Sequence, residues 1–238
     1  MHRLAAEVKL AGLVAFVVVV ACTPRHAVPV FVVDAGVLAA IVAVAQLPVG
    51  LVLSRLAVIT PFVLFALVIP FVAQGPRSEI AGFAVSTEGM WAAWNVVAKA
   101  VLGATAAIAV SATTSLADLL DGMARLHVPA VLVAIVSWMV RYVELVSTQL
   151  GRMRRAMTAR GHDPRWLWQA RPIASSVGVL VVRSYERGER VHTAMLARGF
   201  TGAMVPSERP RAAAGAWVAG LAPAMLATAG LLGWLAGS

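Results

Sequence analysis

Long apolar runs separated by short polar segments make up the first half of the chain, and one further run lies near its end. A helix of about 20 apolar residues crosses the hydrocarbon core of a bilayer. The runs therefore predict an all-α polytopic membrane protein with about five transmembrane helices plus amphipathic helices outside the membrane. The predicted transmembrane helices occupy residues 10–22, 28–46, 56–73, 90–111 and 212–236.

The polar segments between these runs predict the connections. A turn is expected at residues 23–26, and Leu47-Pro48 is expected to break the second helix, with Arg55 anchoring the loop that follows. Residues 74–87 are rich in polar residues, glycine and proline, and they predict a polar loop.

Beyond the fourth run, apolar and charged positions recur with helical spacing. Ser115 followed by Asp118 is typical of a helix N-terminus, and it predicts a short amphipathic helix over residues 115–126 at the membrane interface. The next apolar stretch, residues 130–140, rises only about 16 Å as a helix, half of the hydrocarbon thickness. We expect it to dip into the interface and emerge on the same side.

Two longer amphipathic helices are predicted in the same region. The first continues from the apolar stretch to Gly161, where Gly-His-Asp-Pro forms a stop, and the second runs from about Pro172 to Arg198. Arginine and tryptophan residues at 165–171 predict a basic, aromatic connector between them, and residues 201–211 predict a loop.

Composition and charge give the orientation. The 238 residues are 60% hydrophobic and 13% charged, with a mean hydropathy of +0.83, whereas soluble domains carry about a quarter charged residues. The formal charge is +9, and the arginines cluster beside apolar segments. This pattern marks the cytoplasmic side of a membrane, and it argues against nucleic acid as a partner.

We therefore expect a multi-pass protein of the cell membrane whose N-terminus is cytoplasmic. Residues 1–112 are predicted to hold four transmembrane helices, residues 113–211 to be cytoplasmic, and residues 212–238 to hold the last transmembrane helix. The single cysteine, Cys22, excludes an internal disulfide, and the histidines show no metal-ligand spacing, so no metal is expected to bind this chain.

One short motif occurs twice in the region predicted to be cytoplasmic. Residues 156–161 are Ala-Met-Thr-Ala-Arg-Gly and residues 194–199 are Ala-Met-Leu-Ala-Arg-Gly, and each copy has an arginine four residues before its first alanine. Each glycine is placed as the left-handed residue that ends a helix, and each motif arginine lies in the last turn, where a cation favours the helix dipole. The small alanines allow close approach of a partner.

The repetition favours a shared binding role over ordinary helix capping. A guanidinium at a rigid helix end suits bidentate pairing with a partner carboxylate, and two such ends suit a partner with two similar grooves. The candidate coupling residues are Ala159, Arg160, Gly161, Ala197, Arg198 and Gly199, supported by Arg152, Met157, Arg190 and Met195.

These motifs, the Ala112-Thr113-Thr114 segment and the apolar runs resemble the transmembrane T component of energy-coupling factor (ECF) transporters, the CbiQ/EcfT family. The resemblance implies a non-enzymatic subunit whose two Ala-Arg-Gly helix ends each dock on one of two ABC-type ATPase subunits. It also implies a separate substrate-binding integral membrane subunit, which the coupling subunit reorients. Residues 183–200 resemble the cobalt-type branch most closely.

ATP is expected to be used by the partner subunits, because this sequence has no G-x-x-x-x-G-K-[ST] phosphate-binding loop, and no cofactor is expected on this chain. Two alternatives stay open. Asp34 and Lys99 lie within apolar runs, where charges are costly, and this placement is compatible with a self-contained secondary transporter. The arginines are also compatible with a membrane scaffold that binds anionic lipid.

Overall fold

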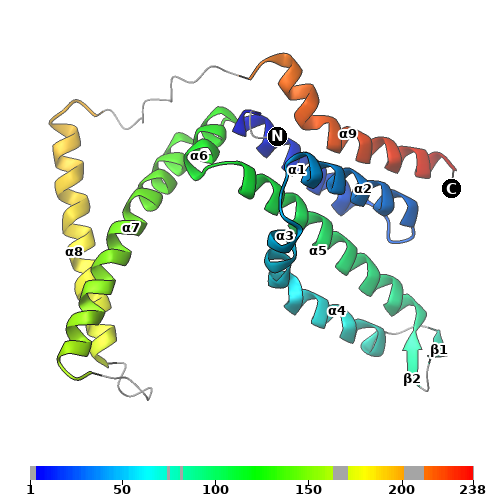
Figure 1. Cartoon of the computed structure of the whole chain (residues 1–238), viewed down its shortest axis with the longest axis horizontal. Coiled ribbons are helices and arrows are strands. Elements are labelled where there is room, and N and C mark those ends of the chain that lie inside the picture. The colour runs from blue at the N-terminus through cyan, green and yellow to red at the C-terminus, as the bar shows by residue number, and fades with distance from the viewer. Residues whose placement is uncertain (1–3, 74–75, 81–82, 163–170, 201–211, 238) are drawn as a thin grey trace. The chain divides into compact units, whose positions relative to one another are not determined.

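The computed structural model describes residues 4–73, 76–80, 83–162, 171–200 and 212–237, and it forms two compact units (Figure 1). The first unit comprises Met1–Leu126 together with Glu208–Ser238, and the second comprises His127–Ser207. The chain passes from the first unit to the second and then returns. Each unit is described in turn.

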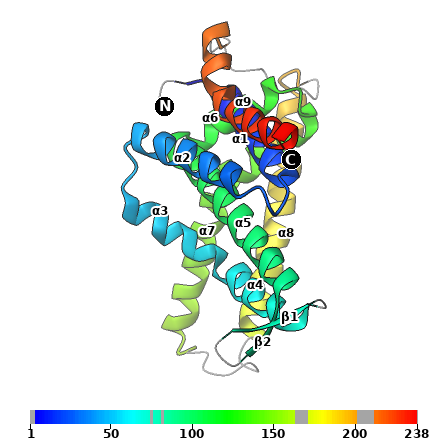
Figure 2. The same ribbon diagram turned by 90° about the vertical axis from the view of Figure 1, so that its right-hand side faces the viewer.

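The first unit is a bundle of helices. Its elements are α1 (Ala6–Cys22), α2 (Val28–Val44), α3 (Val49–Leu56), the 3-10 turn η1 (Ala57–Ile59), α4 (Thr60–Val72), α5 (Thr87–Thr113), α6 (Leu116–Arg125) and α9 (Ala214–Gly237). Helices α1, α2, α5 and α9 surround a common core, whereas α4 packs along α5 and α6 packs against α1 (Figure 2). The core side chains are Phe16, Val20, Phe31, Leu38, Leu102, Ala106, Ala224 and Ala227.

Glycines allow the closest helix contacts in this bundle. A Cβ atom on Gly12 of α1 would clash with the carbonyl oxygen of Gly220 on α9, so these two backbones are in direct contact. A Cβ on Gly89 of α5 would lie 2.7 Å from the Cα of Pro70 on α4. Small residues at helix crossings are typical of membrane proteins, where packing drives association.

The predicted break at Leu47-Pro48 is confirmed, since α2 ends at Val44 and α3 begins at Val49 with Pro48 as its N-cap. Two predicted loops are wrong. Arg55 lies inside α3 and not in a loop. Residues 74–87 contain an antiparallel hairpin of β1 (Arg77–Ile80) and β2 (Phe83–Ser86). Ser86 then caps α5 by accepting a hydrogen bond from the Gly89 amide at 3.3 Å.

The second unit is an antiparallel pair of long helices, α7 (Ala130–Ala159) and α8 (Arg171–Leu196) (Figure 1). The end of α7 lies beside the start of α8, where the Ser176 hydroxyl contacts the Met157 sulfur at 3.6 Å. Among the described side chains of this pair, Leu180 of α8 is buried, and none of α7 is. The two amphipathic helices are thus confirmed, while their predicted connector at residues 163–170 lies outside the described residues, as does the predicted loop at 201–211.

Four helical stretches in the described part of the chain are long and apolar enough to cross a membrane: Val49–Val72, Thr87–Thr113, Ala130–Ala159 and Ala214–Gly237. Helix α2 is a shorter apolar helix. The all-helical polytopic fold is therefore confirmed, with the hairpin as an addition. Helix α7 is continuous through residues 130–140 and meets the length and composition of a span, so the same-side emergence expected of this stretch stays a prediction.

Candidate site at two matched helix ends

The end of α7 is closed by a complete Schellman motif. The His162 amide donates to the Met157 carbonyl at 3.1 Å, and the Gly161 amide donates to the Thr158 carbonyl at 2.9 Å. Gly161 has a φ of +79°, the left-handed conformation that this motif requires and that glycine adopts without a Cβ penalty. Arg160 therefore stands as the last residue before a sharp reversal of the backbone.

The end of α8 repeats this arrangement bond for bond. The Phe200 amide donates to the Met195 carbonyl at 3.0 Å, and the Gly199 amide donates to the Leu196 carbonyl at 3.0 Å. Gly199 has a φ of +83°. Met157 and Met195 thus occupy the same position, each accepting the bond that closes its helix. The predicted role of both glycines as left-handed helix ends is confirmed.

Burial follows the same repeat. The motif methionines are half-buried, whereas the alanines, arginines and glycines of both motifs and the two upstream arginines are exposed. Among the described residues, Arg160 and Arg198 form no ion pair. Arg190 approaches Glu186 at 3.8 Å, and both side chains are more than half exposed, so this pair contributes little to stability.

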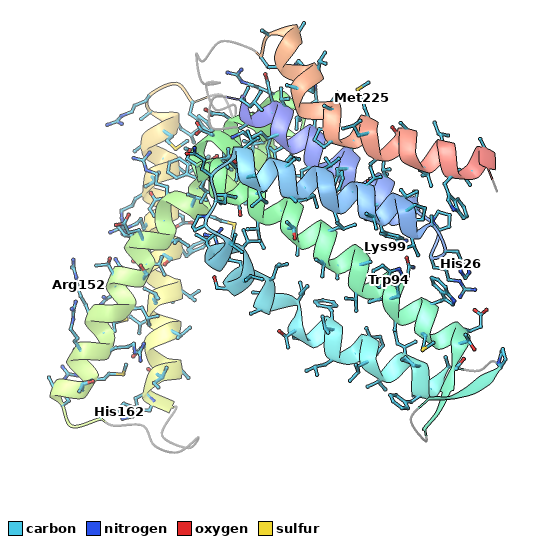
Figure 3. All side chains as sticks on the ribbon, turned by 45° about the vertical axis from the view of Figure 1, so that its right-hand side comes forward. His26, Trp94, Lys99, Arg152, His162 and Met225 are labelled. Carbon is cyan, nitrogen blue, oxygen red and sulfur yellow. The ribbon has the colours of Figure 1, made fainter. Side chains whose placement is uncertain are left out.

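The two arginine ends lie at opposite ends of the α7–α8 pair, because the helices are antiparallel (Figure 1). Arg160 follows the end of α7 next to the start of α8, and Arg198 follows the far end of α8. Figure 3 shows Arg152 on α7 and His162 just beyond the end of this helix. The structure therefore brings the six candidate coupling residues together as two separate, equivalent triplets and not as one cluster.

An apolar groove of about 610 Å³ lies between α7 and α8, and sequence reasoning did not find it. Its walls include Met139, Tyr142 and Val146 from α7, with Val191 and Met195 from α8. Exposed apolar residues continue along α7; Val131 and Val143, for example, are 64% and 67% exposed. The helical stripes were visible in the sequence, but which stripes face each other across a groove depends on how the two helices pair.

The structure does not bring Asp34 and Lys99 together. Asp34 is fully buried in α2, and its carboxylate oxygens have no hydrogen-bond partner among the described residues. Lys99 of α5 donates to the Ala21 carbonyl at 2.7 Å, at the end of α1 (Figure 3). No group of three or more histidine, cysteine, aspartate or glutamate side chains that could hold a metal ion occurs within the described ranges.

Apolar helices packed through glycine contacts, together with two matched helix ends, define a polytopic α-helical membrane protein with a distinct pair of exposed arginine termini. Residues 1–209 match the family described as CbiQ, cobalt transport protein, and the chain belongs to this family. A relative from Rhodobacter capsulatus named cobalt transport protein CbiQ is 33% identical over 133 residues. That match covers 55% of this chain and 54% of the relative, so the chain spans about half the length of the curated relative it matches.

Proposed function

We propose that this chain is the coupling subunit of an ECF-type ABC importer in the cell membrane. It transmits the closure of two ABC-type ATPase subunits to a separate substrate-binding membrane subunit, for uptake of cobalt or of another metal ion or vitamin. Family membership and the name of the relative support a role in cobalt transport. The observation that carries the proposal is the identical capping of two exposed arginine helix ends, at Arg160 and Arg198.

Two equivalent arginine helix ends suit a partner that has two equivalent binding sites. The Schellman motifs stop each helix at the same position relative to its arginine, so each guanidinium leaves a rigid support with the same local backbone. A rigid guanidinium loses little conformational freedom when it pairs bidentately with a carboxylate. Ala159 and Ala197 leave space for a groove wall to approach the backbone. Two related ATPase subunits, each with one acidic groove, match this pair.

The apolar groove between α7 and α8 supports the second half of the proposal. A surface this apolar is not stable against water, so it is expected to be covered by lipid or by an apolar helix. A helix of the substrate-binding membrane subunit fits this description, and its docking there would place it on the same two helices that carry the arginine ends. Movement of the ATPases would then reach the substrate-binding subunit through α7 and α8.

Charge reversal at the two arginines tests the proposal. In membranes that contain the complete transporter, Arg160→Glu and Arg198→Glu are expected to reduce the amount of ATPase that co-purifies with this chain by at least about tenfold, because a reversed charge leaves the partner carboxylate buried and repelled. Arg154→Glu is the matched control, since Arg154 is also exposed on α7 but lies outside the repeated motif. Unchanged ATPase recovery in both motif variants would overturn the proposal.

The buried Asp34 supports one alternative function, that of a self-contained secondary transporter. An unpartnered carboxyl inside a membrane bundle is costly and is often part of an ion or proton path. A secondary transporter of this kind requires no ATPase. Uptake of Co²⁺ by vesicles that contain this chain alone, abolished by Asp34→Asn, would favour that function over coupling.

A further inference from the structure

Two charged side chains in the first turn of α1 are buried, although charged residues at the start of an apolar helix usually face the aqueous boundary. Glu7 and Lys9 are each 6% exposed. Burial of a charge is costly unless hydrogen bonds replace its hydration. Both residues satisfy this condition, and each does so with groups from other helices.

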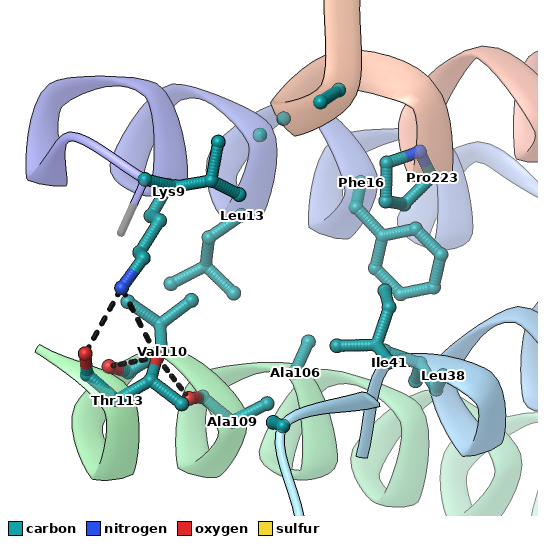
Figure 4. A pocket seen from close by; sticks show the side chains of 15 residues that line it. Lys9, Leu13, Phe16, Leu38, Ile41, Ala106, Ala109, Val110, Thr113 and Pro223 are labelled. Atoms are coloured by element: carbon teal, nitrogen blue, oxygen red, sulfur yellow. Dashed lines mark hydrogen bonds between the residues drawn. The ribbon is translucent and has the colours of Figure 1, made fainter. Parts of the chain in front are cut away.

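Lys9 closes the end of α5. Its ammonium donates to the Thr113 carbonyl at 2.9 Å and to the Thr113 hydroxyl at 3.4 Å (Figure 4). It also donates to the Thr114 hydroxyl at 3.1 Å. The last carbonyls of a helix have no partner within the helix, and the negative end of the helix dipole favours a cation there. Lys9 thus fixes the C-terminus of α5 to the start of α1.

Glu7 holds α6 and the start of α9. One carboxylate oxygen accepts a hydrogen bond from the Ala212 amide at 2.8 Å, and the other lies 3.8 Å from the Arg125 guanidinium. The α6 backbone is also close, since a Cβ on Gly122 would lie 2.9 Å from the Glu7 amide nitrogen. We call Glu7, Lys9 and the groups they bind the α1 junction.

The α1 junction lies where the covalent chain leaves and re-enters the first unit. The chain leaves this unit after Leu126, one residue beyond Arg125, and re-enters it at Glu208, shortly before Ala212. Both covalent connections to the second unit therefore end on segments that Glu7 contacts. The junction therefore joins, within the first unit, the two segments through which the chain is continuous with the second unit.

A small cavity lies beside the junction and extends between α1, α2, α5 and α9 (Figure 4). It has a volume of about 60 Å³, and its lining includes Lys9, Phe16, Ala109, Gly220 and Pro223. Its lining is mainly apolar and includes the cationic Lys9, so the void does not suit a metal ion, but it gives the helices beside it room for small shifts. Pro223 lies inside α9 and removes one helical hydrogen bond there, which eases bending at the cavity.

We propose that Glu7 and Lys9 are positioning residues that transmit movement of α7 and α8 into the transmembrane bundle. The inference rests on the proposed coupling function. Burial of Glu7 and Lys9 is costly even with their hydrogen bonds, and apolar side chains often fill such positions without loss of stability, so stability alone does not explain two buried charges here. The hydrogen bonds and the ion pair of the α1 junction are directional, so they fix α5, α6 and the segment before α9 in position relative to α1. An apolar contact has no such directionality and allows these segments to shift past α1.

Transport measurements on the complete complex form the first test. Glu7→Gln and Lys9→Met are expected to retain ATPase recovery and ATP hydrolysis within about twofold, while uptake of radioactive Co²⁺ falls at least tenfold. Lys9→Arg keeps a cationic donor and is expected to restore most of the uptake. Arg25→Gln is the control, because Arg25 pairs with Glu88 at 2.6 Å in a more exposed position away from the junction. Uptake that stays at the level of this control in both junction variants would overturn the inference.

A second test needs no partner. In nanodiscs, spin labels at Ala117→Cys on α6 and Val218→Cys on α9, with Cys22→Ser as background, report how tightly these helices are held. The junction variants are expected to broaden the label distance distribution and Arg25→Gln to leave it narrow. An unchanged distribution contradicts the inference on its own. Failure of the unmodified chain to recover any ATPase contradicts the coupling function itself and, with it, the transmitting role of the junction.

Discussion

At the scale of single residues, Gly161 and Gly199 have the most constrained backbone of the two arginine ends. Both have a positive φ, and apart from the adjacent backbone no described atom lies within 4 Å of the position a Cβ would take. A side chain at either position would therefore meet only a conformational penalty and no clash. Because no clash is added, substitutions at these two glycines measure only what the left-handed conformation contributes to the stability of each helix end.

Gly161→Ala and Gly199→Ala are expected to loosen the last helical turns. A left-handed conformation costs a residue with a Cβ about 1 kcal/mol, which corresponds to about fivefold faster hydrogen exchange at the His162 and Phe200 amides. Hydrogen-exchange mass spectrometry on peptides that cover each helix end measures this. Gly151→Ala in α7 is the control: Gly151 also has open space but lies within the helix, so alanine should slow exchange there. An effect of Gly151→Ala equal to that of Gly161→Ala and Gly199→Ala would contradict the capping role.

The residue scale also shows what the sequence could and could not predict. The glycine ends were predictable, because a glycine after an arginine in the last turn is a local signal. Glu7 and Lys9 were missed, since charges flanking an apolar run usually face the membrane surface. Their burial depends on the ends of α5, α6 and α9 converging on α1, and nothing local in the sequence records that convergence.

At the scale of elements, the lengths of the apolar runs predicted most of the apolar helices, because a membrane requires long apolar segments. The predicted ends lie within a few residues of the observed ones for most of these helices. The hairpin and α3 were missed, since their formation depends on β pairing and on a proline acting as an N-cap. The lengths of the apolar runs likewise do not predict the contact between α1 and α9. It depends on Gly12 and Gly220 facing each other.

Gly12→Ala is expected to destabilise the bundle by about 1–3 kcal/mol, because its Cβ would meet backbone atoms of Gly220 that move only if α9 moves. Thermal unfolding of the purified protein in nanodiscs measures the change. Gly36→Ala on α2 is the matched control, since Gly36 is exposed and has open space around it. A melting temperature for Gly12→Ala equal to that of the control would show that α1 and α9 do not pack through these glycines.

At the scale of the whole molecule, the coupling proposal depends on which side of the membrane each segment faces. Clustered arginines predict that residues 113–211 are cytoplasmic, and this predicted orientation needs an even number of crossings before α6 when the N-terminus is cytoplasmic. Helix α7 is the element that decides the outcome, because its length and composition suit a crossing while its Arg141 and Glu144 suit an interface. A full crossing at α7 would put Arg160 on the outer side, away from ATP.

Single-cysteine labelling in intact cells separates the two arrangements. With Cys22→Ser as background, Arg25→Cys in the turn between α1 and α2 is expected to react with a membrane-impermeant maleimide. Thr148→Cys, exposed in the second half of α7, is expected to react only after permeabilisation, because the arginines of this half predict a cytoplasmic location. Labelling of Thr148→Cys in intact cells at the rate of Arg25→Cys would mean that α7 crosses the bilayer. The α7 arginine end would then have no access to an ATPase.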